Sequence, residues 1–416
     1  QMEDMLNQCA SLTGIHMPFK QCFRLLMLVK NLTILSYGQC NDTVPYPTVH
    51  HNPHVFSGSC AQVEILIQRW LLPPLMLLCA TGNILALLIY RLSYFDGSSS
   101  VHFLRFKALA NLIFVTSRPL EVIHAWTVPV WPAFEHLFWH TRGYIMPISN
   151  ICGTMSTWLT LLVTIETLLC VTMPFTFRQY CTSKITWTLL AITLIFSSCL
   201  NLAVIPTQGG SLDASARLWQ SEDESAPPCW HISYFYTFTQ SGQLAALQTS
   251  IYWAQMVSVV LLPTLAMLVC SAIIIRIFST RAFGDTFSQR RKCVIRMTVS
   301  TTLSHLLLEG PALFTYSAAA IWGLGGRMSN VFCILNHIIN LGSVVNATIP
   351  FFLFLLCSDQ FRHMTAVFVR AQMETNRERR AQILAQAGTR ISTRHNRYMG
   401  PERSIADSNL LSIAKL

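Results

Sequence analysis

The sequence is short of charged residues. Asp, Glu, Lys and Arg together make up 12% of its 416 residues, about half of the roughly 25% that is usual in soluble domains. Hydrophobic residues make up 52%, and this balance excludes a disordered chain and an ordinary soluble enzyme. The charges that are present are mostly basic and give a formal net charge of +10. In a membrane protein such an excess gathers on the cytoplasmic face, so it does not call for a nucleic-acid partner.

Motifs for chemistry within a membrane are also missing. No apolar segment holds a pair of Asp residues, an H-E-x-x-H pair of metal ligands, or a Ser with evident catalytic partners. We therefore expect no enzymatic activity, no cofactor and no metal site.

Long apolar runs are what the sequence has instead. A membrane-spanning helix needs about 20 mostly apolar residues, and such runs lie at 70–90, 102–126, 143–174, 185–208, 250–275, 293–322 and 328–358. The second is the weakest, because Arg118 and Glu121 interrupt it. The runs predict an all-α membrane protein with a bundle of seven transmembrane helices.

The connecting segments predict how the chain is oriented and divided. The loops after the first, third and fifth helices hold eleven basic residues, including Arg105, Lys107 and Arg291, against three in the alternate loops. The basic side is cytoplasmic, so residues 1–69 form an extracellular tail and 70–358 the membrane domain. Residues 359–372 predict a short amphipathic helix on the membrane surface, in contact with lipid, and 373–416 a basic cytoplasmic tail.

The extracellular tail carries signs of secretion. Asn31 and Asn41 begin glycosylation sequences. The run 17–37 resembles a signal peptide, but Arg24 and Lys30 interrupt it, so that interpretation is the less favoured one. Among the cysteines expected outside the membrane, Cys60 and Cys229 are the preferred disulfide pair, and Cys333 is the alternative partner.

Several motifs occur in a recognisable order. They are Thr81-Gly82-Asn83, Ala108-Leu-Ala-Asn111-Leu, Trp158 to Glu166 followed by Pro174-Phe175, Pro263, Pro311, and Asn346-Ala-Thr-Ile-Pro350-Phe-Phe-Leu-Phe354. With them the segment 71–370 resembles the rhodopsin-like (class A) G-protein-coupled receptors, and among these the invertebrate FMRFamide-type neuropeptide receptors. The resemblance implies an extracellular peptide ligand and a heterotrimeric G protein as partners.

Four positions depart from the pattern of that family. Asn111 replaces its Asp, Thr167 its Arg, Glu309 its aromatic residue before the proline of the sixth helix, and Phe354 its final Tyr. These changes leave open a receptor-like binding or scaffold protein that does not activate a G protein. A transporter or channel is less favoured, because no inverted repeat is visible.

The resemblance also implies which residues bind ligand: Glu309, Glu121, Trp253 and Ser149. Glu309 either accepts a cationic group of the ligand or is a neutral acid bonded to His305 or His337. For Glu121 an ion pair with Arg118 is the favoured interpretation. Retinal is disfavoured because no Lys occurs between Lys292 and Lys415, and small amines because Ser149 stands where their receptors have Asp.

The switch residues implied by the resemblance are Glu166, Thr167, Asn111, Asn83, Pro311, Asn346, Phe354 and Arg291. Glu166 is either a restraint that has lost its Arg partner, with Arg291 and its basic neighbours as substitutes, or a plain interfacial acid. Asn83 and Asn111 are expected to form a neutral pair between helices, with sodium binding weak or absent.

Overall fold

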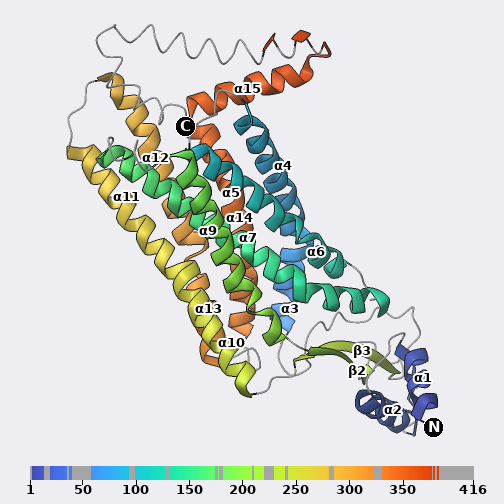
Figure 1. The fold of residues 1–416 in the computed structure, drawn as a ribbon. Coiled ribbons are helices and arrows are strands. Elements are labelled where there is room, and N and C mark those ends of the chain that lie inside the picture. Colours follow the sequence, from blue (N-terminus) through green and yellow to red (C-terminus); the bar gives the residue numbers. More distant parts are fainter. Residues whose placement is uncertain are drawn as a thin grey trace.

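The structure is a computed structural model that describes most of the chain up to residue 383. The described ranges are 2–13, 19–34, 37–39, 58–92, 99–126, 132–173, 177, 181–208, 210–219, 229–238, 242–280, 285–322, 330–376, 378–379 and 382–383. An elongated helical bundle makes up most of it (Figure 1). We call the end that lies near strands β2 and β3 the sheet end, and the opposite end the α15 end.

Five stretches of helix in the described residues are long and apolar enough to cross a membrane: Gln62–Tyr90, His140–Thr172, Ser183–Leu202, Ala246–Ile277 and Asn330–Cys357. They belong to α3 (Gly58–Ile65), η1 (Leu66–Leu71) and α4 (Leu72–Tyr90), to α7 (Pro132–Thr172), to α9 (Ser183–Leu202), to α10 (Gly242–Gln255), η4 (Met256–Leu261) and α11 (Leu262–Thr280), and to α14 (Asn330–Cys357). Several begin earlier than their apolar run predicts, so they extend beyond it at the sheet end.

Two further helices of the bundle are broken. One consists of α5 (Ser99–Thr116) and α6 (Pro119–Trp126), and the other of α12 (Asp285–Leu308) and α13 (Ala312–Trp322). They coincide with the second and sixth apolar runs, and α5 packs against α4 and α7. Each break lies at a proline, which lacks the backbone N–H that would continue the helical ladder.

The second break is built around Gly310. Its N–H bonds the carbonyl of His305, five residues back, at 3.2 Å, because Pro311 follows and cannot take part in the regular ladder. A Cβ added at Gly310 would lie 2.2 Å from the Leu306 carbonyl oxygen, so only glycine fits there. The break holds Glu309 in place between two helical segments.

Prolines also account for the two π-helical turns, η1 and η4. The turn η1 ends one residue before Leu72-Pro73, and η4 ends one residue before Leu262-Pro263. A proline ring clashes with the carbonyl four residues earlier, and a π turn moves that carbonyl out of the way without ending the helix. The first and fifth runs therefore stay continuous despite their prolines.

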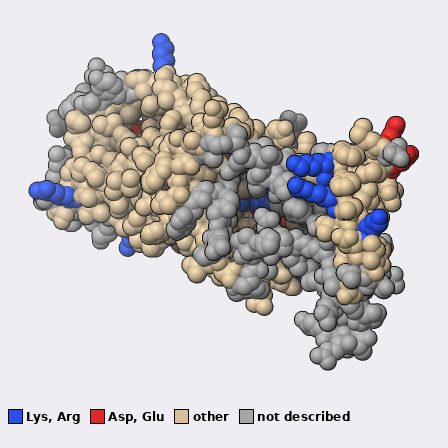
Figure 2. All heavy atoms as spheres, turned by 90° about the horizontal axis from the view of Figure 1, so that it is seen from below, with Lys and Arg blue, Asp and Glu red and all other residues tan. Residues whose placement is uncertain are grey.

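At the sheet end the described chain is more ordered than a plain tail and loop. Helices α1 (Met2–Thr13) and α2 (Phe19–Ile34) are joined by a Cys9–Cys22 disulfide, and α2 contacts β2. Strand β2 (Gly210–Trp219) pairs antiparallel with β3 (Cys229–Phe238), which also pairs with β1 (Gly38–Gln39). Exposed Lys20, Arg24 and Lys30 lie on α2. Viewed from below, several basic side chains lie at the right of the molecule, and others are scattered over its left part (Figure 2).

At the other end α15 (Asp359–Met373) covers the predicted segment 359–372. The Ser358 hydroxyl caps it by accepting from the Phe361 N–H at 3.2 Å. Phe361 is 1% exposed and packs on Tyr90 and Phe354, with ring centroids 5.7 and 5.6 Å apart. The aromatic Phe354 thus fixes α15 against α4 and α14.

The preferred Cys60–Cys229 disulfide is wrong, and the alternative partner of Cys60, Cys333, is confirmed. Cys60 on α3 is bonded to Cys333 on α14, with their Cα atoms 6.1 Å apart, and Cys229 is in another disulfide. Cys60 pairs with Cys333 because α3 and α14 pack side by side. The sequence around Cys229 does not indicate that this residue lies on a strand. This bond ties the first span to the last.

Replacing Cys60 and Cys333 together by Ser should lower the thermal unfolding midpoint of the purified protein, because the bond closes a loop of 273 residues. Loss of a native disulfide of this kind costs about 2–5 kcal/mol. The control is Cys9→Ser with Cys22→Ser, which opens a loop of 13 residues and should have the smaller effect. Equal midpoints for the Cys60/Cys333 variant and the native chain would contradict a stabilising role.

Candidate ligand site and transmission core

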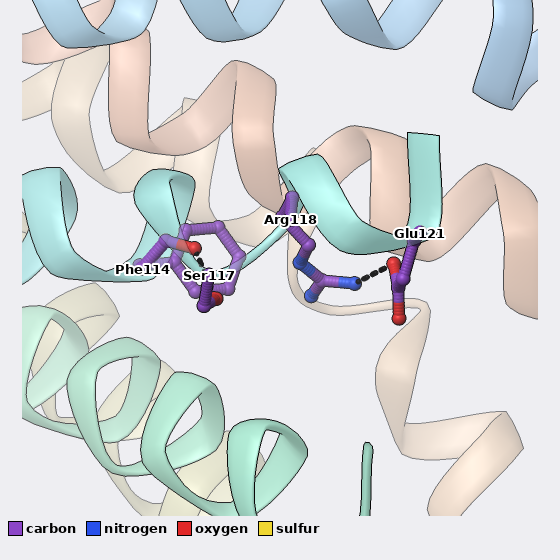
Figure 3. Close-up of polar contacts among 4 residues, drawn as sticks. All are labelled: Phe114, Ser117, Arg118 and Glu121. Atoms are coloured by element: carbon purple, nitrogen blue, oxygen red, sulfur yellow. Dashed lines mark hydrogen bonds and ion pairs between the residues drawn. The ribbon is translucent and has the colours of Figure 1, made fainter. Parts of the chain in front are cut away.

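The break between α5 and α6 presents an ion pair. The Arg118 guanidinium donates to the Glu121 carboxylate at 3.1 Å, and both side chains are largely buried (Figure 3). Arg118 also lies over the Phe114 ring, 5.0 Å from its centroid. The predicted pairing of these two residues is confirmed. Its position at the break follows from Pro119, which begins a new helix directly after Arg118.

Further charges from other spans surround this pair. Arg142 on α7 and His337 on α14 both act electrostatically on Glu121, and Nε2 of His337 lies 3.9 Å from a Glu64 carboxylate oxygen on α3. We call Glu64, Arg118, Glu121, Arg142 and His337 the sheet-end charge cluster. It brings four separate stretches of the bundle together around groups of both signs.

Two other predicted ligand residues have different surroundings. Ser149 on α7 is 1% exposed, and its hydroxyl has no hydrogen-bond partner among the described residues. Trp253 on α10 is 43% exposed, so it is not enclosed within the bundle. Ser149 thus offers a buried polar group, whereas Trp253 offers an accessible aromatic surface.

Arginines cap the ends of the first two spans, which the loop assignment had missed. Arg105, expected in a loop, lies within α5 and donates from Nε to the carbonyl of Tyr90, at the end of α4, at 2.8 Å. Arg69 in η1 donates to the carbonyl of Ala125, near the end of α6. Each span thereby satisfies a terminal carbonyl of the other, and the charge is favourable at that end of a helix.

The asparagines of the first two spans meet as predicted. Asn111 donates to the Asn83 side-chain oxygen at 3.3 Å, and both amides donate to the carbonyl of Ala347 on α14, at 3.1 and 3.2 Å. A Cβ at Gly82 would lie 3.1 Å from the Phe351 ring, so the glycine lets α4 and α14 approach closely. The neutral pair between helices is confirmed and extends to a third helix.

Glu309 has partners other than the two histidines predicted for it. Asn346 donates to one of its carboxylate oxygens at 3.3 Å and Ser343 to the other at 3.4 Å. Both partners lie on α14. The alternatives His305 and His337 are therefore wrong as its described hydrogen-bond partners. Asn346 also receives a bond from Ser304 at 3.5 Å, so both α12 and the break that follows it are linked to α14.

Lys107 is the main residue that the sequence analysis misplaced. It lies inside α5, is 7% exposed, and its ammonium group donates to the Thr160 hydroxyl of α7 at 2.6 Å. It forms no direct ion pair with Glu309 among the described residues, but the two groups, where both are charged, attract each other over a longer distance. We call Asn83, Lys107, Asn111, Glu309 and Asn346 the transmission core. The available signal was the predicted span 102–126, which already contains this Lys, four residues before Asn111 on the same helix face.

At the α15 end Glu166 is held by the start of α5. The Ser99 hydroxyl donates to its carboxylate, and Ser100 also bonds to it. A carboxylate is stabilised at a helix N-terminus by the free N–H groups and the helix dipole. Thr167 bonds the carbonyl of Val163 at 2.8 Å, as a helical Thr commonly does. The side chain of Arg291, the proposed substitute partner, lies outside the described residues.

A second buried polar group joins α7, α9 and α10. Asn201 donates to the Thr154 hydroxyl at 3.2 Å and accepts from the Gln255 amide at 3.2 Å. Trp158 donates to the carbonyl of Ser258 in η4, also at 3.2 Å. A shallow apolar groove of about 370 Å³ lies between α9 and α10, lined by Phe196, Cys199, Leu200, Ala203, Ser250, Ile251 and Ala254. None of the predicted site residues lines this groove.

The arrangement thus combines spanning helices, charges at one end and a polar core within them. A family model described as serpentine type 7TM GPCR chemoreceptor Srw matches residues 127–371. The chain belongs to this family. It is therefore a multi-pass membrane receptor of the G-protein-coupled type for an extracellular ligand. No curated protein matches the chain.

The family match supports only the broader part of the resemblance seen in the sequence. It supports a G-protein-coupled receptor rather than a transporter or channel, but not the FMRFamide-type branch in particular. The matched region runs from the start of α7 into α15 and includes Glu309 and Asn346. The Lys107 and Glu121 positions, and Cys60, lie before it.

The attraction between Lys107 and Glu309 can be measured by a double-mutant cycle. Lys107→Met and Glu309→Gln should each lower the thermal midpoint of the purified receptor, because each leaves a buried charge without its partner, at a cost of about 3–5 kcal/mol. The double variant should lose less than the sum, with a coupling of about 1–3 kcal/mol. Lys184→Met removes an exposed charge and should change little. Strict additivity would show that the two charges act independently.

Proposed function

We propose that the chain is a seven-span plasma-membrane receptor for an extracellular peptide that signals through a heterotrimeric G protein. The five continuous spans and the two broken helices supply the seven crossings. The excess of basic residues in alternate loops favours an extracellular sheet end and a cytoplasmic α15 end. In this orientation exposed Asn31 on α2 is accessible for glycosylation. Asn41, the other predicted acceptor, lies outside the described residues.

The observation that carries the ligand proposal is the sheet-end charge cluster. Ionisable groups inside a membrane protein are costly, so those that are present usually serve a function. This cluster draws them from four stretches of the bundle. Nε of Arg118 is buried without a described hydrogen-bond partner, and the Ser149 hydroxyl is in the same condition. A peptide offers the carbonyl, carboxylate and cationic groups that would satisfy both signs of charge.

Glu121 and Ser149 therefore stay in the proposed ligand site, with Trp253 as an aromatic contact at its exposed edge. Glu309 has a different proposed role. Its bonds go to Asn346 and Ser343, and its attraction to Lys107 links the sixth helix to the second. Ligand-induced movement of the sixth helix about the Gly310-Pro311 break would separate these partners and open the α15 end to a G protein.

A receptor that binds ligand without activating a G protein is the second candidate. It is favoured by one local observation: Thr167 stands where the related receptors carry Arg, and its hydroxyl bonds the backbone of its own helix. Glu166 meanwhile is held by Ser99 and Ser100. Restoring Arg at position 167 separates the two candidates, because only a chain that lacks coupling for this reason would gain signalling from Thr167→Arg.

Cells that express the receptor at their surface should respond to at least one peptide from a panel of amidated basic, neutral and acidic sequences. Arg118→Gln and Glu121→Gln should each raise the concentration needed for half-maximal response at least about tenfold, which corresponds to about 1.4 kcal/mol. Lys20→Gln removes an exposed charge from α2 and serves as the control. Equal potency on all four chains would remove the charge cluster from the ligand site.

Glu309→Gln should raise signalling without ligand, because the attraction that holds the sixth helix to Lys107 is lost while the hydrogen bonds to α14 can remain. The measurement is basal second-messenger output per receptor at the cell surface, compared with Ser343→Ala, which removes one bond and keeps the charge. An unchanged or lower basal output in Glu309→Gln, with normal surface expression, would count against a restraining role.

A further inference from the structure

Four side chains with metal-binding chemistry meet where α3 packs on α14. Cys60 and Glu64 lie on α3, and Cys333 and His337 lie on α14. Members of each pair are four residues apart, so they share one face of their helix. The ligand atoms of Cys60, Cys333 and His337 all lie within 4.8 Å of one another, and a Glu64 oxygen is 3.9 Å from His337 Nε2.

The group matches what zinc requires. Two thiolates, an imidazole and a carboxylate are common zinc ligands, and a structural site holds four of them in a tetrahedron. With bonds of about 2.0–2.3 Å to the metal, neighbouring ligand atoms in such a site lie about 3.3–3.8 Å apart. The imidazole and carboxylate are already near this spacing. The two sulfurs are bonded to each other and must separate, which rotation of their side chains permits between Cα atoms 6.1 Å apart.

We propose that reduction of the Cys60–Cys333 disulfide converts this junction into a zinc site with Cys60, Glu64, Cys333 and His337 as ligands. A thiol reductant supplies two electrons and two protons, so the S–S bond breaks into two thiols while two reductant thiols join as a disulfide. Zn²⁺ then displaces the two thiol protons and binds both sulfurs. The metal link takes the place of the covalent one, and α3 stays fastened to α14 in both states.

The surroundings favour a bound metal. Two thiolates and a carboxylate carry three negative charges against the two positive charges of zinc, so the occupied site has a net charge of about −1. Arg142 acts electrostatically on His337 and Glu121, and the Arg118 guanidinium belongs to the same cluster. These cations compensate the excess negative charge. Cys60 is 1% and Cys333 7% exposed, as suits a closed structural site.

The test uses the full-length receptor in detergent, reduced with a phosphine and freed of reductant without air. Added Co²⁺ should give the thiolate charge-transfer and tetrahedral ligand-field absorption of a sulfur-bound metal, and Zn²⁺ should displace it at about one ion per chain. The oxidised receptor should show neither. The reduced Cys60→Ser/Cys333→Ser variant should lose this absorption signal. His337→Gln and Glu64→Gln should each lower the affinity for Zn²⁺ at least about tenfold.

Reduced Cys9→Ser/Cys22→Ser is the matched control, because it lacks the other described cysteine pair and should keep the signal. His337→Gln and Glu64→Gln retain the disulfide, so their folding is verified in the oxidised state before reduction. The proposal is overturned if the reduced native chain shows no thiolate–Co²⁺ absorption. It is also overturned if the signal survives in Cys60→Ser/Cys333→Ser or is lost only in Cys9→Ser/Cys22→Ser. Neither result bears on peptide signalling, which the cell assay measures separately.

Discussion

The structure depends on one constraint: a polar group inside the bundle must find its partner within the protein, because lipid offers none. Short side chains meet it locally, as when the Thr160 and Thr348 hydroxyls bond carbonyls four residues back. Longer ones meet it between helices. Arg69 and Arg105 satisfy helix ends, and Asn83 and Asn111 share the carbonyl of Ala347. Polar contacts of this kind fix which helices lie side by side.

Two of the buried charged residues lie beside broken helices. A proline removes a backbone donor and leaves carbonyls without their usual partners. Arg118 precedes one such break and Glu309 another, separated from its proline by a glycine that tolerates no Cβ. A side chain beside a break is positioned by two helical segments at once. The breaks therefore serve both the path of the backbone and the placement of charge.

Much of this arrangement could be predicted from the sequence, because the length of an apolar run and the spacing of residues along one helix can be read directly from neighbouring positions. The run 328–358 became one helix, the three-residue spacing of Arg118 and Glu121 became an ion pair, and Phe361 and Met364 became the buried face of α15. The two broken helices follow from prolines that are visible in the sequence. The pairing of Asn83 with Asn111 needed the family resemblance as well.

What could not be predicted depends on contacts between distant segments. The sequence alone allowed Cys229 or Cys333 as the partner of Cys60. Only the packing of α3 on α14 selects Cys333. Lys107 was assigned to a loop because basic residues usually mark one, and nothing in its neighbourhood names Thr160 or Glu309 as partners. For Glu309 the histidines one turn away or on α14 were chemically reasonable. The described bonds of Glu309 go instead to the amide of Asn346 and the hydroxyl of Ser343.

Lys107 determines how the positive charge near Glu309 is supplied. Its ammonium is a cation attached to the backbone of α5, so its local concentration near Glu309 is set by the fold and does not change with the surrounding fluid. A freely diffusing ion in that position would come and go with its bulk concentration. The buried positive charge on α5 is therefore part of the chain itself, one per receptor, and its supply does not depend on the salt content of the surrounding fluid.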